Sequence, residues 1–102
     1  MNVKINFLSQ HLNDIDYDEL CLQLYYFTDH LTSDYPHHKE WFFKKHLPFI
    51  GKDREIIYLT FHRNICGVAF LKKTALEKKI CTFYVTEHSR NHGVGHLLLE
   101  EC

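Results

Sequence analysis

The chain has 102 residues, of which 45% are hydrophobic and 15% aromatic, and its formal net charge is -1. This length and composition predict one globular domain with its own core and exclude a disordered segment. No apolar run approaches the roughly 18 residues of a membrane span, and the first residues lack the apolar stretch of a signal peptide. We therefore expect a cytoplasmic protein with no membrane partner.

The charges are unevenly spread along the chain. Residues 1–40 carry seven acidic and two basic residues, whereas residues 41–102 carry six acidic and ten basic residues. The excess of basic residues in 41–102 favours an anionic ligand bound to the C-terminal half. A solvated protein surface can have the same composition. A nucleic-acid partner is not expected, because the basic residues form no dense stripe.

The first half of the chain predicts a strand and two helices. Residues 3–7 alternate between apolar and polar side chains, as in a half-buried strand. Residues 16–31 predict a helix with acidic residues in its first turn. A second helix is expected from a cap at Ser33 or Asp34, with Pro36 in its first turn, to Leu47. The buried face of the first helix is expected to consist of Leu20, Leu24, Phe27 and Leu31.

The second helix contains three consecutive aromatic residues, Trp41, Phe42 and Phe43. One helix face does not bury three consecutive side chains, so one of them is expected at a groove or a partner surface. The alternative is that all three cover a small core.

The second half of the chain predicts a meander of three strands. Residues 55–62 and 65–72 are rich in β-branched and aromatic residues, and Arg63 and Asn64 between them indicate a tight hairpin. A third strand, over residues 79–85, is expected to pair antiparallel with the second.

The third strand leads into a polar turn with two glycines and then a leucine-rich segment. Gly93 and Gly95 precede Leu97, Leu98 and Leu99, so we expect strand, loop and helix. Backbone N–H groups in the first turn of a helix have no intrahelical partner, and they bind anions such as phosphate. Arg90 adds a positive charge to this loop.

The histidines of this loop, His88, His92 and His96, recur every four residues. The two glycines interrupt a regular helix through them, and no glutamate lies between His92 and His96. We therefore expect histidines of a loop and a helix cap, and no metal site.

The segment Arg90-Asn91-His92-Gly93-Val94-Gly95, after a strand that ends at Val85, resembles the Arg/Gln-x-x-Gly-x-Gly/Ala signature of the GNAT superfamily of N-acetyltransferases. The resemblance implies an α+β fold with a mixed, mainly antiparallel sheet flanked by helices. Residues 1–102 would form a single, incomplete domain, because the helix after the motif has barely begun at Cys102.

The resemblance also implies acetyl-coenzyme A as co-substrate and acetyl transfer to a primary amine on a small molecule or a protein. The pyrophosphate would lie on the loop and the pantetheine arm along the strand, as if it were a neighbouring strand. The implied cofactor-binding residues are Phe83, Tyr84, Val85, Arg90, Asn91, His92, Gly93, Val94, Gly95 and His96.

The resemblance also points to catalytic and acceptor residues. A backbone N–H near Tyr84 or Val85 would hold the thioester oxygen. Glu87 is the candidate base, with His88 and Glu55 as alternatives. The first two helices would line the acceptor site, with contacts from Tyr26, Asp29, Tyr35 and Trp41.

Several interpretations remain open. The chain is either a shortened transferase, a protomer whose partner completes the sheet, or a domain that binds acyl-coenzyme A without turnover. A noncatalytic module that forms homodimers through the exposed strand edge is the chief rival. A dinucleotide-binding loop fits less well, because Leu98 stands where the third glycine would be.

Overall fold

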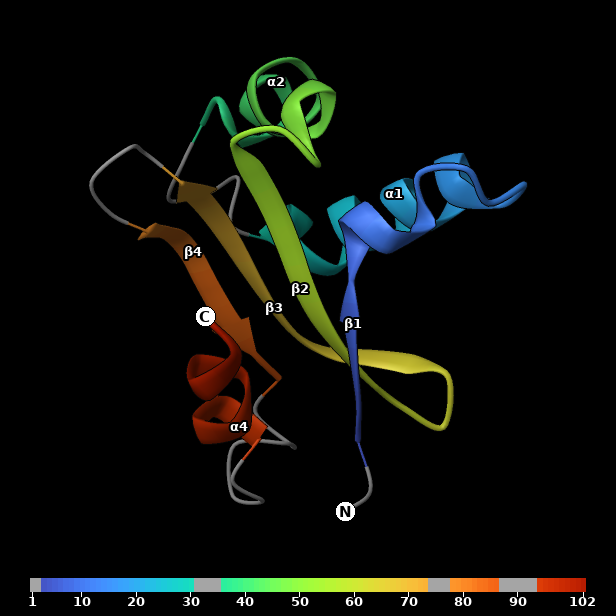
Figure 1. Ribbon diagram of the computed structural model, residues 1–102, viewed down its shortest axis with the longest axis vertical. Coiled ribbons are helices and arrows are strands. Elements are labelled where there is room, and N and C mark those ends of the chain that lie inside the picture. Colours follow the sequence, from blue (N-terminus) through green and yellow to red (C-terminus); the bar gives the residue numbers. More distant parts are fainter. Residues whose placement is uncertain (1–2, 31–35, 74–77, 87–93) are drawn as a thin grey trace.

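The computed structural model describes residues 3–30, 36–73, 78–86 and 94–102, which form an antiparallel sheet with helices on both faces (Figure 1). The four strands lie in the order β1-β2-β3-β4, which is also their order in the chain. The strands are β1 (Lys4–Phe7), β2 (Arg54–Phe61), β3 (Asn64–Lys73) and β4 (Lys78–Val85). The longer helices are α1 (Tyr17–Thr28) and α4 (Val94–Glu101), and a series of short helical turns comprises η1 (Leu8–His11), α2 (His38–Glu40), η3 (Trp41–His46) and η4 (Leu47–Phe49).

The two central strands are apolar on both sides because helices cover both faces of the sheet. Ile56 and Tyr58 on β2 face the core beneath α1 and the short helices, whereas Ile57 and Leu59 face α4. The sheet therefore separates two hydrophobic cores, and α4 contributes Leu98 to the second. This arrangement agrees with the expected α+β class and mainly antiparallel sheet.

Helix α1 agrees with the expected helix over residues 16–31, but its buried face differs. The buried residues are Cys21, Leu24, Tyr25 and Thr28. Tyr25 and Thr28 are buried because both contact His38: the Tyr25 ring stacks on the imidazole with centroids 5.9 Å apart, and Thr28 Oγ1 lies 3.0 Å from His38 Nε2. Leu31 lies outside the described residues.

The second helix differs from its expected form. A turn at Pro36 and His37 precedes α2, and η3 is a π-helical turn, after which Pro48 lies within η4 rather than beyond the end of the helix. All three aromatic residues of this segment pack on the first core, with Phe42 fully buried and Trp41 and Phe43 partly buried. The expected caps, Ser33 and Asp34, lie outside the described residues.

The β-meander agrees with the sequence to within one or two residues. Its first hairpin turns at His62 and Arg63, one residue earlier than expected, and both have positive φ, +51° and +67°. Strand β4 pairs antiparallel with β3, and a register shift leaves Cys81 as an additional residue on β4. In the described part of the chain, no helix has the length and apolar character needed to cross a membrane.

Candidate functional site

The C-terminal end of β4 contains the three residues expected to contact the pantetheine arm. Phe83, Tyr84 and Val85 pair with Ala69, Val68 and Gly67 on β3. In the described sheet β4 has β3 as its neighbour on one side and is the edge strand on the other. An edge strand of this kind is what an extended ligand requires in order to bind as an additional strand.

Helix α4 places three of the expected phosphate-loop residues in its first turn. It begins at Val94, so Gly95 and His96 belong to the turn whose N–H groups have no intrahelical partner. The helix runs back along β4, and at its far end Lys78 Nζ donates a hydrogen bond to the Cys102 carbonyl at 3.1 Å. Glu87 and the remaining loop residues, Arg90, Asn91, His92 and Gly93, lie outside the described residues.

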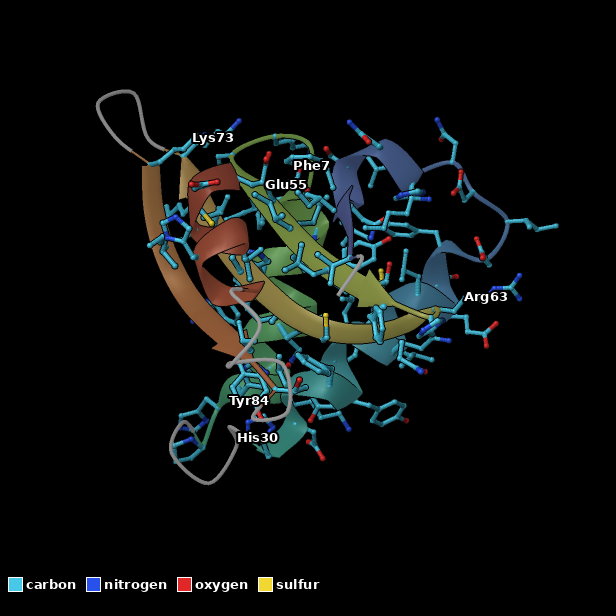
Figure 2. All side chains as sticks on the ribbon, turned by 90° about the horizontal axis from the view of Figure 1, so that it is seen from below. Phe7, His30, Glu55, Arg63, Lys73 and Tyr84 are labelled. Carbon is cyan, nitrogen blue, oxygen red and sulfur yellow. The ribbon has the colours of Figure 1, made fainter. Side chains whose placement is uncertain are left out.

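The Tyr84 side chain lies on the α1 side of the sheet, whereas Val85 faces α4. Its ring contacts Phe27 edge-on, with centroids 5.4 Å apart, and the His30 imidazole, with centroids 4.5 Å apart (Figure 2). The end of α1 is thereby brought against the end of β4. His30 and Tyr84 therefore meet where these two elements adjoin.

Residue His30 was not expected from the sequence. It is exposed and lies two residues beyond the end of α1. A signal was present, because residues three apart on a helix face the same side, and His30 follows Phe27 by three.

Three of the four expected acceptor residues lie within the described part of the chain. Tyr26 is 66% exposed near the end of α1, and Asp29 accepts a hydrogen bond of 2.8 Å from the Tyr25 hydroxyl. Trp41 packs instead in the aromatic core, with ring centroids 4.7 Å from His46 and 5.6 Å from Phe70. Tyr35 lies outside the described residues.

Glu55, an alternative candidate for the base, joins β2 to η1. Its Oε1 accepts hydrogen bonds of 3.0 Å from the Ser9 and Ile56 backbone N–H groups, and its Oε2 accepts a hydrogen bond from the Ser9 hydroxyl. These three bonds give the carboxylate a structural role. Among the described residues, no group of three or more His, Cys, Asp or Glu side chains is arranged to hold a metal ion.

No family model matches the chain, and no curated protein matches it. A solved structure of an integron cassette protein from the mobile metagenome of V. cholerae is similar, with a TM-score of 0.51 and 21% sequence identity. The match covers 99% of this chain and 65% of the cassette protein, so the chain spans about two thirds of the length of that structure. At this identity the similarity concerns the fold alone.

Proposed function

We propose that the chain is an acetyl-coenzyme A dependent N-acetyltransferase domain of the GNAT type, or the N-terminal part of one. The observation that carries the proposal is the succession of an edge strand, β4, and a helix, α4, whose first turn contains Gly95 of the Arg90 to Gly95 motif. The order of elements supports it: a strand and helices precede a meander of three strands and the motif helix, which is the order that the resemblance implies.

In this proposal, the acceptor amine approaches from the α1 side of β4, near His30 and Tyr84. Its nitrogen attacks the thioester carbonyl carbon, so that a C–N bond forms and the C–S bond breaks. A backbone N–H near Tyr84 or Val85 stabilises the oxyanion. The amine proton passes to a base, with Glu87 as the candidate, and the departing thiolate takes up a proton.

The test is a titration of the purified chain with acetyl-coenzyme A, followed by measurement of thiol release with a panel of primary amines. The variant Gly95→Glu places a carboxylate in the first turn of α4. An acidic residue there is favourable for the helix but repels a pyrophosphate bound to the same turn. We therefore expect unchanged thermal stability and an affinity at least about tenfold weaker, since 1.4 kcal/mol corresponds to tenfold.

Leu99→Glu is the matched control, because it adds the same charge one helical turn further along α4 at a side chain that is 53% exposed. Acetyl-coenzyme A should bind this variant as it binds the original chain. Equal affinities for the two variants, or no binding by the folded protein, would contradict the proposed site. Binding without thiol release would favour the noncatalytic alternative, and the mass in solution shows whether a homodimer forms.

A further inference from the structure

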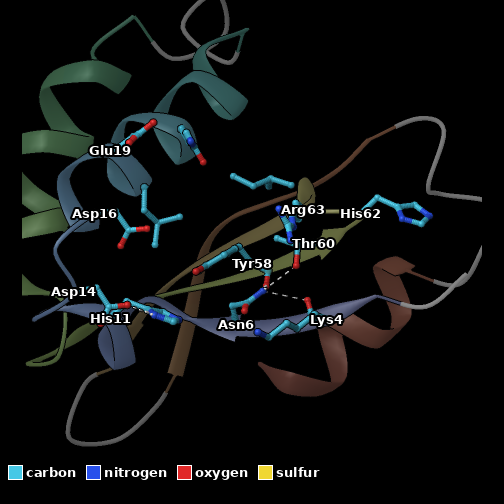
Figure 3. Close-up of a pocket in the computed structure, with 13 residues that line it drawn as sticks. Lys4, Asn6, His11, Asp14, Asp16, Glu19, Tyr58, Thr60, His62 and Arg63 are labelled. Atoms are coloured by element: carbon cyan, nitrogen blue, oxygen red, sulfur yellow. Dashed lines mark hydrogen bonds and ion pairs between the residues drawn. The ribbon is translucent and has the colours of Figure 1, made fainter.

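A second candidate site lies on the α1 side of the sheet at the β1 edge, apart from the end of β4 (Figure 3). It is a cleft of about 650 Å³, which lies within the usual range for small-molecule sites. Its floor is formed by two cross-strand pairs, Lys4 with Thr60 and Asn6 with Tyr58. These side chains are polar, whereas the neighbouring Ile56, Val68 and Phe70 on the same face belong to the first core.

The walls of the cleft carry opposite charges. Asp14, Asp16 and Glu19, from the segment before α1 and its first turn, line one side. Lys4 on β1 and Arg63 on the β2–β3 hairpin line the other. Figure 3 shows the carboxylates and the two cations on opposite sides of Tyr58.

Tyr58 is the central group of the floor. Its side chain is only 4% exposed, and its hydroxyl makes none of the hydrogen bonds found among the described residues. Figure 3 shows the hydroxyl directed towards the acidic wall. Burial, followed by the charges of Asp14 and Asp16, raises the pKa of the Tyr58 phenol, so the group is a neutral donor and acceptor.

The floor is held in place by Asn6, which is buried. Its Nδ2 donates to the Lys4 carbonyl at 3.2 Å, and to the Tyr58 carbonyl and Thr60 Oγ1 at 3.3 Å each. These bonds fix β1 against β2 beneath the cleft. The backbone of Tyr58 is therefore held in place by Asn6, and its side chain is buried.

We propose that this cleft binds a small zwitterionic ligand, a free amino acid or a short peptide, with its ammonium group against Asp16 and Tyr58 and its carboxylate against Arg63. The phenol oxygen accepts a hydrogen bond from the ammonium group, and the guanidinium fork suits a carboxylate. This site has its floor on β1 and β2 and its walls on the segment before α1 and the β2–β3 hairpin, so it does not depend on the proposed acetyltransferase site at the end of β4.

The experiment is calorimetric titration of the chain at low salt with glycine, glycylglycine and triglycine, without acetyl-coenzyme A. The three lengths separate the two charges by increasing distances, and the best binder shows whether an amino acid or a peptide is preferred. Its C-terminal amide and its N-acetyl form each lack one charge. We expect each blocked form to bind at least about tenfold more weakly, since a hydrogen bond to a charged group contributes about 1.5–3 kcal/mol.

Variants identify the groups involved. Asp16→Asn, Arg63→Gln and Tyr58→Phe should each weaken binding of the best zwitterion by about tenfold. Asp16 makes no side-chain capping bond, and the Tyr58 hydroxyl has no partner in the described structure, so neither substitution should prevent folding. Asp18→Asn is the control, because Asp18 lies in the same helical turn as Glu19 but does not line the cleft.

Three results would overturn the proposal. The first is that none of the three zwitterions binds the folded chain. The second is that the best zwitterion and one of its blocked forms bind equally well. The third is that the Asp16→Asn and Asp18→Asn variants lose the same amount of affinity. Binding of acetyl-coenzyme A is measured separately, so failure at one site is distinguishable from failure at the other.

Discussion

At the scale of single residues, His46 shows how burial fixes a protonation state. Its side chain is fully buried, its Nε2–H donates to the Glu55 carbonyl at 3.2 Å, and its Nδ1 lies 3.3 Å from Arg54 Nη1. Since guanidinium groups only donate hydrogen bonds, Nδ1 must be the acceptor. The pair of contacts fits the neutral imidazole, and burial lowers the pKa of His46 to about 4.

This pKa predicts a loss of stability in mild acid. A histidine in the unfolded chain has a pKa of about 6.5, so between pH 6.5 and about 4 the unfolded state binds a proton that the folded state does not. The free energy of unfolding should therefore fall as the pH is lowered through this window, by about 3 kcal/mol from His46 at 1.36 kcal/mol per pH unit. Urea denaturation at a series of pH values measures this change.

The variant His46→Gln tests the assignment, because glutamine does not titrate. The variant should be less stable at neutral pH, but its free energy of unfolding should depend much less on pH below 6.5. Part of the remaining pH dependence comes from His38, whose pKa is also lowered by burial. The exposed His62 provides the control variant His62→Gln, which should keep the full dependence. An unchanged pH profile in His46→Gln would show that another group is responsible.

Glu55 gives a second prediction at this scale. Because its carboxylate accepts hydrogen bonds from Ser9 and Ile56, Glu55→Gln replaces one accepting oxygen with an NH₂ group that faces donors. We expect the free energy of unfolding to fall by about 1.5–3 kcal/mol. Glu40→Gln is the control, since Glu40 and Lys44 form an exposed pair at 3.7 Å and such a pair contributes at most about 1 kcal/mol. A Glu55→Gln variant as stable as the control would leave the role of Glu55 open.

At the scale of elements, the strands were predictable from the sequence and the second helix was not. Continuous apolar runs identify strands covered on both faces, as β2 and β3 are. The predicted face of α1 is confirmed for Leu24, with Leu20 and Phe27 partly buried on the same core, but Tyr25 and Thr28, which contact His38 on α2, were missed. The π-helical turn η3 likewise depends on tertiary packing, and no local pattern marked it.

The succession of β4 and α4, on which the candidate site is based, was predictable from chain order, whereas the contacts around it depend on packing. Tyr84, Val85 and Gly95 were named because a strand, a loop and a helix follow one another in the sequence. The contact of His30 with Tyr84 requires the end of α1 to lie against β4, and the partial burial of Trp41 requires the aromatic core. The β1-edge cleft joins residues from β1, η1, α1, β2 and β3, which no local motif indicates.

The first hairpin carries a prediction about an element. His62 and Arg63 both have positive φ, which costs residues other than glycine about 1 kcal/mol each, and Asn-Gly is the pair that such two-residue turns prefer. Replacing His62-Arg63 by Asn-Gly should raise the free energy of unfolding by about 1 kcal/mol, as measured by urea denaturation. Replacing both by valine, which strongly disfavours positive φ, should lower it. If both double variants changed stability in the same direction, backbone strain in this turn would not be the cause.

At the scale of the whole molecule, helix α4 is the one helix described on its face of the sheet, and it carries the first turn of the proposed cofactor site. It is only eight residues long, and isolated helices of this length are marginal in water. Its stability must therefore come from packing on the sheet. The contact is close at Gly67, where a β-carbon would lie 3.4 Å from Leu98 Cδ2 and 3.5 Å from Val85 Cγ2.

Two adjacent leucines of α4 allow this dependence to be tested. Leu98 is fully buried, and Leu98→Ala removes about 2–5 kcal/mol of packing, whereas Leu99 is 53% exposed and Leu99→Ala should change little. Because α4 is short and depends on this packing, we expect the loss to appear as faster hydrogen exchange of the α4 amides, with exchange in β2 and β3 less affected. Affinity for acetyl-coenzyme A should fall in the same variant, since undocking α4 removes the N–H groups proposed to hold the pyrophosphate. Unchanged exchange in Leu98→Ala would mean that α4 is held by other contacts, and unchanged affinity with faster exchange would place the cofactor elsewhere.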